Sequence, residues 1–307
     1  MRSIPVVFAC LLSLPHTSCR QPPELVSGPG FAAVLPGDSV GLDLKLFEHE
    51  SVVGVEEDTP LVVLETRFLK VEPGLASKVL GGEGLPFRKV NAEELNRVLP
   101  RDTERADFRE LGSPKLTSFS GQLSHTVLIT QAAYIQDYVM EASGSGESAA
   151  GPELTPRIGV LNTGIVVQVR PVVRGEEIEI RQLDARLVEK LGTRVCEARV
   201  AGRNGPSDLI WQEPVLLTAR PDPGFPDSVR LAKNETLVVP LRYQVRQASA
   251  NARAYATPST IRETYYPSSD TWTGERSALE FECLVLLDAR PTTSEERQAM
   301  LDRRKEP

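Results

Sequence analysis

The chain has 307 residues, of which 40% are hydrophobic and 25% are charged, an ordinary composition for a globular protein that can bury a sizeable core. Its formal net charge of −7 argues against nucleic-acid binding, which needs a basic face to neutralise phosphates. Aromatic residues make up 6%, too few to expect a stacking platform for single strands, and no apolar run reaches the roughly 18 residues of a membrane-spanning helix.

Residues 1–19 have the order of an export signal. Arg2 precedes an apolar stretch, residues 4–14, that is too short to span a membrane. The sequence Pro-His-Thr-Ser-Cys follows, and it resembles a bacterial lipobox with an atypical His16. We therefore expect removal of the segment through Ser18, a lipid-modified Cys19, and a location in the cell envelope, at the outer membrane or in the periplasm. The alternatives are plain cleavage near Ser18 and an uncleaved apolar N-terminus.

Residues 20–59 predict a tether followed by a small β segment. Residues 20–30 are rich in proline and glycine, which is typical of a tether. After them, one alternating apolar run predicts a short strand: Val40, Leu42, Leu44 and Leu46.

Residues 60–291 predict one mainly β domain with a single short helix, residues 91–99. Asn91 is a suitable N-cap and Glu94 lies at the capping-box position. The apolar stripe of this helix consists of Leu95, Val98 and Leu99, and Pro100 ends it. The remaining residues, 292–307, form a charged tail that could be a short helix or fray in solvent.

The most strand-like part of the domain is residues 159–181. Apolar residues at 165, 167 and 169 alternate with Val166, Gln168 and Arg170, which predicts a half-buried strand, and Pro171 favours an edge or a strand end. Arg-Gly-Glu at 174–176 predicts a hairpin turn. Apolar residues then occupy even positions up to Ile180 and odd positions from Leu183 onward. This shift by one residue predicts a β-bulge near Gln182. Residues 143–152 are polar and glycine-rich and predict a mobile loop.

The order of the β segments resembles the core of the bacterial secretins, the outer-membrane subunits of type II and type III secretion systems. The matching segments are residues 60–74, 113–138, 159–173, 228–243 and 278–291. The resemblance implies an antiparallel sheet with hairpins, one of them turning at Lys233-Asn234-Glu235. It also implies partners that are further copies of the chain or other secretion or envelope components.

The chain departs from the secretin pattern in two places. Val239-Pro240-Leu241 replaces the double glycine of the family, and residues 247–277 are polar where the family carries its gate segment. Few residues precede the first strand to hold the family's N-terminal modules. We therefore expect no complete gated channel from this chain alone.

Two cysteines lie outside the export segment. Cys196 and Cys283 both fall on apolar faces of predicted strands, so they are either a disulfide or two separate buried thiols. No Cys-x-x-Cys spacing or cluster of histidines accompanies them, so the sequence offers no metal ligands.

The sequence offers no catalytic or cofactor-binding residues either. The histidines, His16, His49 and His125, are isolated, and Ser120-Gly121-Gln122 fits a turn and not a hydrolase elbow. The acidic residues 176, 177 and 179 predict a solvated face. One aromatic group could contact a partner or a membrane interface, or simply pin a loop: Tyr255, Tyr265, Tyr266 and Trp272.

The sequence therefore predicts a non-enzymatic envelope protein that works in or beside a secretion or pilus assembly of the outer membrane, with no small-molecule substrate. A monomeric lipoprotein that uses the sheet as a partner-binding scaffold is the alternative, and an envelope hydrolase is a distant third. The expected core is Val63, Phe68, Leu116, Ile129, Ile165, Val167, Val169, Val238, Phe281 and Val285.

Overall fold

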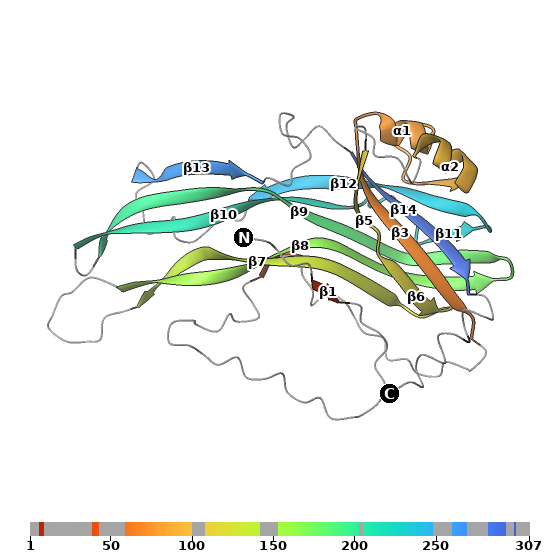
Figure 1. Cartoon of the computed structure of the whole chain (residues 1–307), viewed down its shortest axis with the longest axis horizontal. Coiled ribbons are helices and arrows are strands. Elements are labelled where there is room, and N and C mark those ends of the chain that lie inside the picture. The colour runs from red at the N-terminus through yellow and green to blue at the C-terminus, as the bar shows by residue number, and fades with distance from the viewer. Residues whose placement is uncertain are drawn as a thin grey trace, which may run out of the picture.

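The computed structural model describes residues 6–8, 39–42, 59–99, 108–141, 153–202, 205–247, 260–268, 282–292 and 298. These residues form fourteen strands, joined in one sheet, and two helices, which confirms the mainly β fold (Figure 1). Several expectations concern residues outside this described part of the chain: Cys19, the tether, Leu44, Leu46, the loop 143–152, Phe281 and most of the charged tail.

The strands run through the whole described chain. Along the sheet their order is β1-β7-β8-β9-β10-β12-β14-β3-β5, with β11 and β13 paired to β9, β2 to β8, β4 to β12 and β6 to β3. All pairs are antiparallel except β2 with β8. Their bounds are β1 Val6–Phe8, β2 Ser39–Gly41, β3 Leu61–Val71, β4 Arg88–Asn91, β5 Phe108–Gly112, β6 Lys115–Phe119, β7 Ser124–Glu141, β8 Glu153–Arg174, β9 Glu177–Gly202, β10 Gly205–Pro221, β11 Ser228–Leu231, β12 Glu235–Gln247, β13 Arg262–Pro267 and β14 Glu282–Pro291.

Four strands are unusually long and form two hairpin arms. β7, β8, β9 and β10 have 18, 22, 26 and 17 residues, against a usual length of about 3–10. β8 pairs with β9 only from residue 164 onward. Residues 153–163 of β8 pair with β7. Residues 192–202 of β9 pair with β10, and residues 192–197 also pair with β13. We call residues 130–141 with 153–163 the β7–β8 arm, and residues 192–202 with 205–214 the β9–β10 arm. Figure 1 shows both extending away from the helices.

The point where the arms separate requires a glycine. Gly164 has φ +137°, and a Cβ at this position would lie 2.1 Å from the carbonyl oxygen of Leu128. A side chain would therefore collide with the backbone of β7, which explains the glycine at the point where the arms separate.

Two predictions for β8 and β9 are confirmed. Gln182 and Leu183 together oppose Val169, and Gln182 has φ +50°, so the β-bulge is present where the apolar parity shifts. Pro171 lies just beyond the end of the β7–β8 ladder at Val169, and its carbonyl accepts a bond from the amide of Gly121 (2.6 Å). At this position β8 no longer pairs with β7, so the missing N–H of the proline breaks no hydrogen bond between these two strands.

The predicted helix is present as α2 (Ala92–Val98), and Asn91 caps it by accepting a bond from the amide of Glu94 (2.7 Å). The carboxylate of Glu94 binds Arg88 (2.8 Å). The expectation of only one helix is wrong, because α1 (Leu75–Leu80) precedes it. This helix has six residues and no side-chain N-cap, so it lacks the usual start signal, although Gly81 stands at its C-terminal end.

The second expectation that fails is the hairpin around Asn234. The turn itself exists, with Asn234 at φ +69° and a bond from the amide of Glu235 to the carbonyl of Ala232 (3.1 Å). However, β11 pairs with β9, while β12 pairs with β10, β14 and β4. Both strands turn apolar residues to the same core, so they face each other across it instead of pairing side by side.

The single sheet folds over on itself around the largest core cluster. One side of this cluster consists of residues of β8, β9 and β11, the other of residues of β3, β12 and β14, and β10 connects the two sides. We call these two sides the two layers. A second cluster packs α1 and α2 against β3, β12 and β14. Of the ten expected core residues, eight are buried: Val63, Phe68, Ile129, Ile165, Val167, Val169, Val238 and Val285. Leu116 is half-buried against the main cluster, and Phe281 lies outside the described residues.

Candidate functional site

The inner faces of the two arms pack against each other. Trp211 lies directly opposite Cys196, and Leu209 opposite Ala198, so these residues share one face of the β9–β10 arm. That face contacts Ile135, Tyr138 and Leu154 of the β7–β8 arm. The long strands therefore do not project as separate ribbons, because a shared apolar layer holds them together.

A buried carboxylate lies at the base of this apolar layer. Glu213 is fully buried and accepts bonds from the indole nitrogen of Trp211 (3.0 Å) and the side-chain amide of Gln247 (2.5 Å). These bonds satisfy oxygens that would otherwise be costly to bury. They also fix β10 to the end of β12, so the base of the β9–β10 arm is held rigidly.

The strand edges of the arms differ in how they are covered. β13 pairs with β9 over residues 192–197. On β10, the hydroxyl of Tyr138 bonds both the carbonyl (3.0 Å) and the amide (3.2 Å) of Ile210. By contrast, the outer edge of β7 over residues 130–141 pairs with no strand of the described chain, and β1 covers only residues 127–129.

The two cysteines are free, buried and in different clusters, which fits the alternative of two separate thiols. Cys196 lies between the arms and Cys283 in the main core. Burial raises the pKa of the Cys283 thiol to about 12, so it remains protonated at neutral pH.

The described members of the other groups singled out in the sequence do not come together, and four residues lie outside the described part of the chain: His16, His49, Tyr255 and Trp272. His125 is on β7 opposite Gln168, and Ser120-Gly121-Gln122 forms the turn between β6 and β7. Tyr265 and Tyr266 lie exposed on β13. Within the described residues there is no group of three or more His, Cys, Asp or Glu side chains that could hold a metal ion. No described helix is long and apolar enough to cross a membrane.

Two groups of charged residues were missed by the sequence reasoning. Glu179 is buried and ion-paired, so the expected solvated acidic face is wrong at this position. Lys70 is buried in the core and pairs with Glu189 (2.5 Å). Charged residues within apolar strands were the available signal, but only the packing shows which of them are paired.

Comparison of the chain with models of known families and with curated proteins found no match.

Proposed function

We propose that the chain is a non-enzymatic cell-envelope protein that works by assembly, with further copies of itself or with components of a secretion or pilus system of the outer membrane. The observation that carries this proposal is the outer edge of β7. It presents residues 130–141 without a strand partner among the described residues, a length of roughly 40 Å.

An unpaired edge of this length is a template for strand addition. Backbone N–H and C=O groups at such an edge gain hydrogen bonds when another strand pairs with them, which gives affinity without any special pocket. One of them is already used, because the amide of Tyr138 donates to the carboxylate of Asp137 (2.8 Å). The packed inner layer and the buried Glu213 hold the arms in shape before a partner arrives. The order of the segments that resemble the secretin core supports the same conclusion.

The N-terminal segment bears on this edge. β1 comes from the apolar stretch of the proposed export signal, and it pairs Val6–Phe8 with residues 127–129 of β7. Removal of the segment would lengthen the free edge of β7. We further propose that Cys19 then carries lipid, because it ends the lipobox-like order of residues 1–19. Each buried lipid CH₂ contributes roughly 0.8 kcal/mol to membrane binding, so the lipid would anchor the protein. Unchanged membrane fractionation of Cys19→Ala would contradict the lipid anchor.

A second candidate, a monomeric lipoprotein that uses its sheet as a scaffold, is favoured by the edge of β10. Tyr138 already satisfies both backbone groups of Ile210, and β13 already covers the edge of β9. Within one chain, the β10 edge at Ile210 and the β9 edge over residues 192–197 are therefore already occupied.

The mass of the detergent-extracted protein distinguishes the two candidates. Assembly predicts a multimer by light scattering and an SDS-resistant band; the scaffold predicts one chain. Val139→Lys puts a charge beside the free edge of β7 and should weaken the multimer. Ile210→Lys is the matched control, because Ile210 is 44% exposed against 47% for Val139 but lies at the occupied edge.

We also expect oligomerisation to be separable from pore activity. Purified protein added to a planar bilayer should give no large discrete conductance, because the segment that carries the gate in the secretins is replaced by a polar stretch. Stable large channels would show that the resemblance extends to a complete pore.

A further inference from the structure

One end of the sheet has a charged outer face built from three strands. In the register of β8, β9 and β11, Arg170 lies opposite Arg181, which lies opposite Ser228; Glu179 lies between Val172 and Arg230 in the next row. Directly opposed residues of antiparallel strands point to the same side. We call this side the arginine face; its charged members are Arg170, Arg174, Arg181, Arg230, Glu177 and Glu179.

The arginine face has the opposite sign to the protein as a whole. Four guanidinium groups against two carboxylates leave two positive charges in excess, whereas the whole chain carries −7. The other side of the same strands is apolar and belongs to the main core, with Ile180 and Val229 among its buried residues. The arginines are therefore fixed on a rigid sheet.

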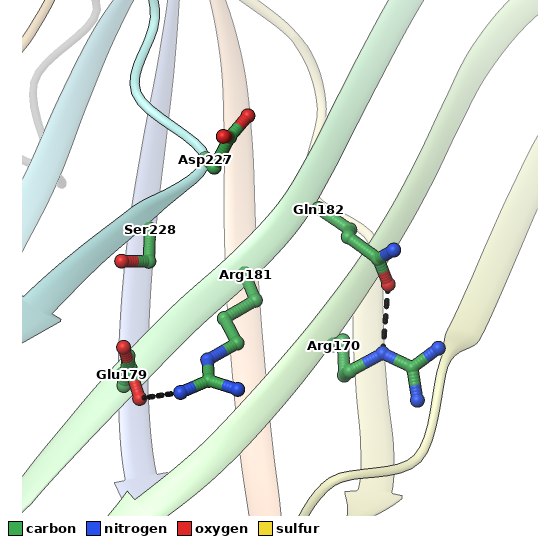
Figure 2. Close-up of a pocket in the computed structure, with 6 residues that line it drawn as sticks. All are labelled: Arg170, Glu179, Arg181, Gln182, Asp227 and Ser228. Carbon is green, nitrogen blue, oxygen red and sulfur yellow. Dashed lines mark hydrogen bonds and ion pairs between the residues drawn. The ribbon is translucent and has the colours of Figure 1, made fainter.

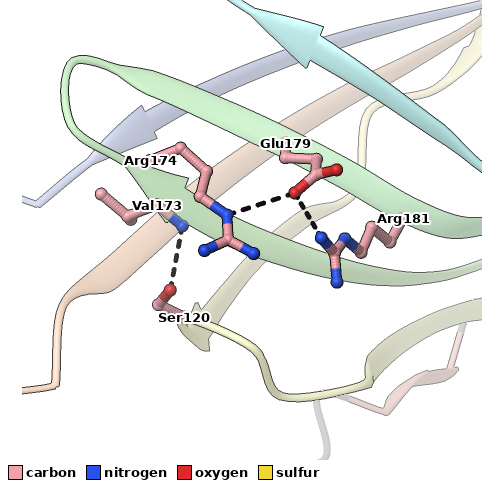
Figure 3. A network of polar contacts seen from close by, with 5 residues as sticks. All are labelled: Ser120, Val173, Arg174, Glu179 and Arg181. Atoms are coloured by element: carbon pink, nitrogen blue, oxygen red, sulfur yellow. Dashed lines mark hydrogen bonds and ion pairs between the residues drawn. The ribbon is translucent and has the colours of Figure 1, made fainter.

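Glu179 holds two of the arginines in place. One of its carboxylate oxygens lies 2.6 Å from Arg181 and 3.4 Å from Arg174 (Figure 3). The side chain of Glu179 is 8% exposed, and the hydrogen bond from Arg181 is the main reason that its pKa lies below the ordinary value. Glu179 therefore stays ionised at neutral pH, and a single carboxylate orients two guanidinium groups.

A hollow of about 520 Å³ opens beside these residues and is lined by Arg170, Glu179, Arg181, Gln182, Asp227 and Ser228 (Figure 2). Its size lies within the roughly 300–1,000 Å³ of small-ligand sites. Arg170 is held by the side chain of Gln182 (2.7 Å) and the carbonyl of Gly121 (2.8 Å). In Figure 2 the carboxylate of Asp227 points away from both guanidinium groups.

The backbone at this hollow is strained. Gln182 has φ +50°, a left-handed conformation that costs a non-glycine residue free energy and that occurs often at binding sites. Arg170 and Arg181 directly opposite each other are also unfavourable, because like charges repel across a strand pair. An anion placed between the two guanidinium groups would offset that repulsion.

We propose that this hollow binds a phosphate monoester. Arginine binds phosphate through paired N–H donors in a fixed geometry, and a monoester carries about −1.5 to −2 charges. Within the lining, Glu179 and Asp227 balance Arg170 and Arg181, so the positive excess comes from the neighbouring arginines of the face. Four arginines against Glu177, Glu179 and Asp227 leave one positive charge in excess around the hollow. The hydroxyl of Ser228 adds a neutral donor in the lining. The phosphate group can come from a soluble molecule or from the headgroup of phosphatidic acid. This site is independent of whether the chain assembles.

The test measures binding by calorimetry at low salt, with inorganic phosphate and glucose 6-phosphate as probes and glucose as the neutral control. Vesicles of phosphatidylcholine with or without phosphatidic acid form a second arm, measured by flotation. The full chain carries Cys19→Ala there, so that no lipid anchor contributes. Phosphate binding in solution assigns a soluble source, and binding only to the phosphatidic acid vesicles assigns the lipid headgroup.

Arg170→Gln and Arg181→Gln should each weaken binding by roughly tenfold or more, the usual effect of losing a hydrogen bond to a charged group. Arg230→Gln should also weaken binding, because Arg230 contributes to the positive excess beside the hollow; its position is exposed, so this variant covers the case in which the first two unfold. Arg199→Gln is the matched control, since Arg199 is an exposed arginine of the β9–β10 arm. Absence of binding in both arms, or equal loss with Arg199→Gln, would overturn the proposal.

Discussion

The ion pair between Lys70 and Glu189 offers a sharp test of how the two layers are held together. Lys70 is on β3, directly opposite Cys283, and its side chain is 2% exposed. Its ammonium lies 2.5 Å from a carboxylate oxygen of Glu189 on β9, whose side chain is 19% exposed. Since β3 and β9 do not pair in the sheet, the contact connects the layers through the main core.

The magnitude follows from this geometry. At 2.5 Å and an effective dielectric constant of about 20, the attraction is about 7 kcal/mol. The desolvation of each ion costs several kcal/mol, so the net contribution of the pair is small. Removing one partner is different, because the other ion stays buried and loses its counter-charge. Glu189→Leu should cost about 5 kcal/mol, because Lys70 is the more deeply buried ion, and Lys70→Met should cost about 3 kcal/mol.

The assay is a double-mutant cycle by urea unfolding. We expect the double variant Lys70→Met/Glu189→Leu to lie within about 1 kcal/mol of the wild type, so that the coupling exceeds about 3 kcal/mol. If either single variant unfolds outright while the double variant folds, the same conclusion holds. A coupling below about 0.5 kcal/mol, or a smaller loss for Glu189→Leu than for Lys70→Met, would refute the reasoning.

Three further predictions concern single residues. Val167→Asp should lower the free energy of unfolding by several kcal/mol, because Val167 is buried in the main core. Gln168→Asp, on the other face of β8, should change it little. If urea unfolding gives the same loss of stability for both variants, the assigned faces are wrong. The Cys283 thiol, with a pKa near 12, should resist iodoacetamide in the native protein and react after unfolding; rapid native alkylation, read by mass spectrometry, would show that it is accessible. Because the pKa of Glu179 is lowered in the folded protein, its contribution to stability is complete above the ordinary glutamate pKa of about 4.3 and is lost as the pH falls through the folded pKa. The melting temperatures of the wild type and Glu179→Gln should therefore converge in acid. A difference in melting temperature that widens in acid would contradict the sign of this effect.

The amino-acid sequence determined the local structure of this protein where backbone and side-chain periodicity act over a few residues. The alternation at 165–169 placed the buried face of β8, and the parity shift placed the bulge at Gln182. The cap at Asn91 began α2 in the expected place. Each of these features is fixed by neighbours close in the chain, so a sequence shows them directly.

Only the tertiary structure decided which strands are neighbours. The turn at Asn234 is visible in the sequence, but the two strands it joins lie in different layers, because burying apolar residues against the main core outweighs local hairpin pairing. The pairing of Lys70 with Glu189 depends in the same way on contacts between distant segments. The arginine face also arises from register, which aligns positions 170, 181 and 230 although each is an ordinary charged residue in its own strand.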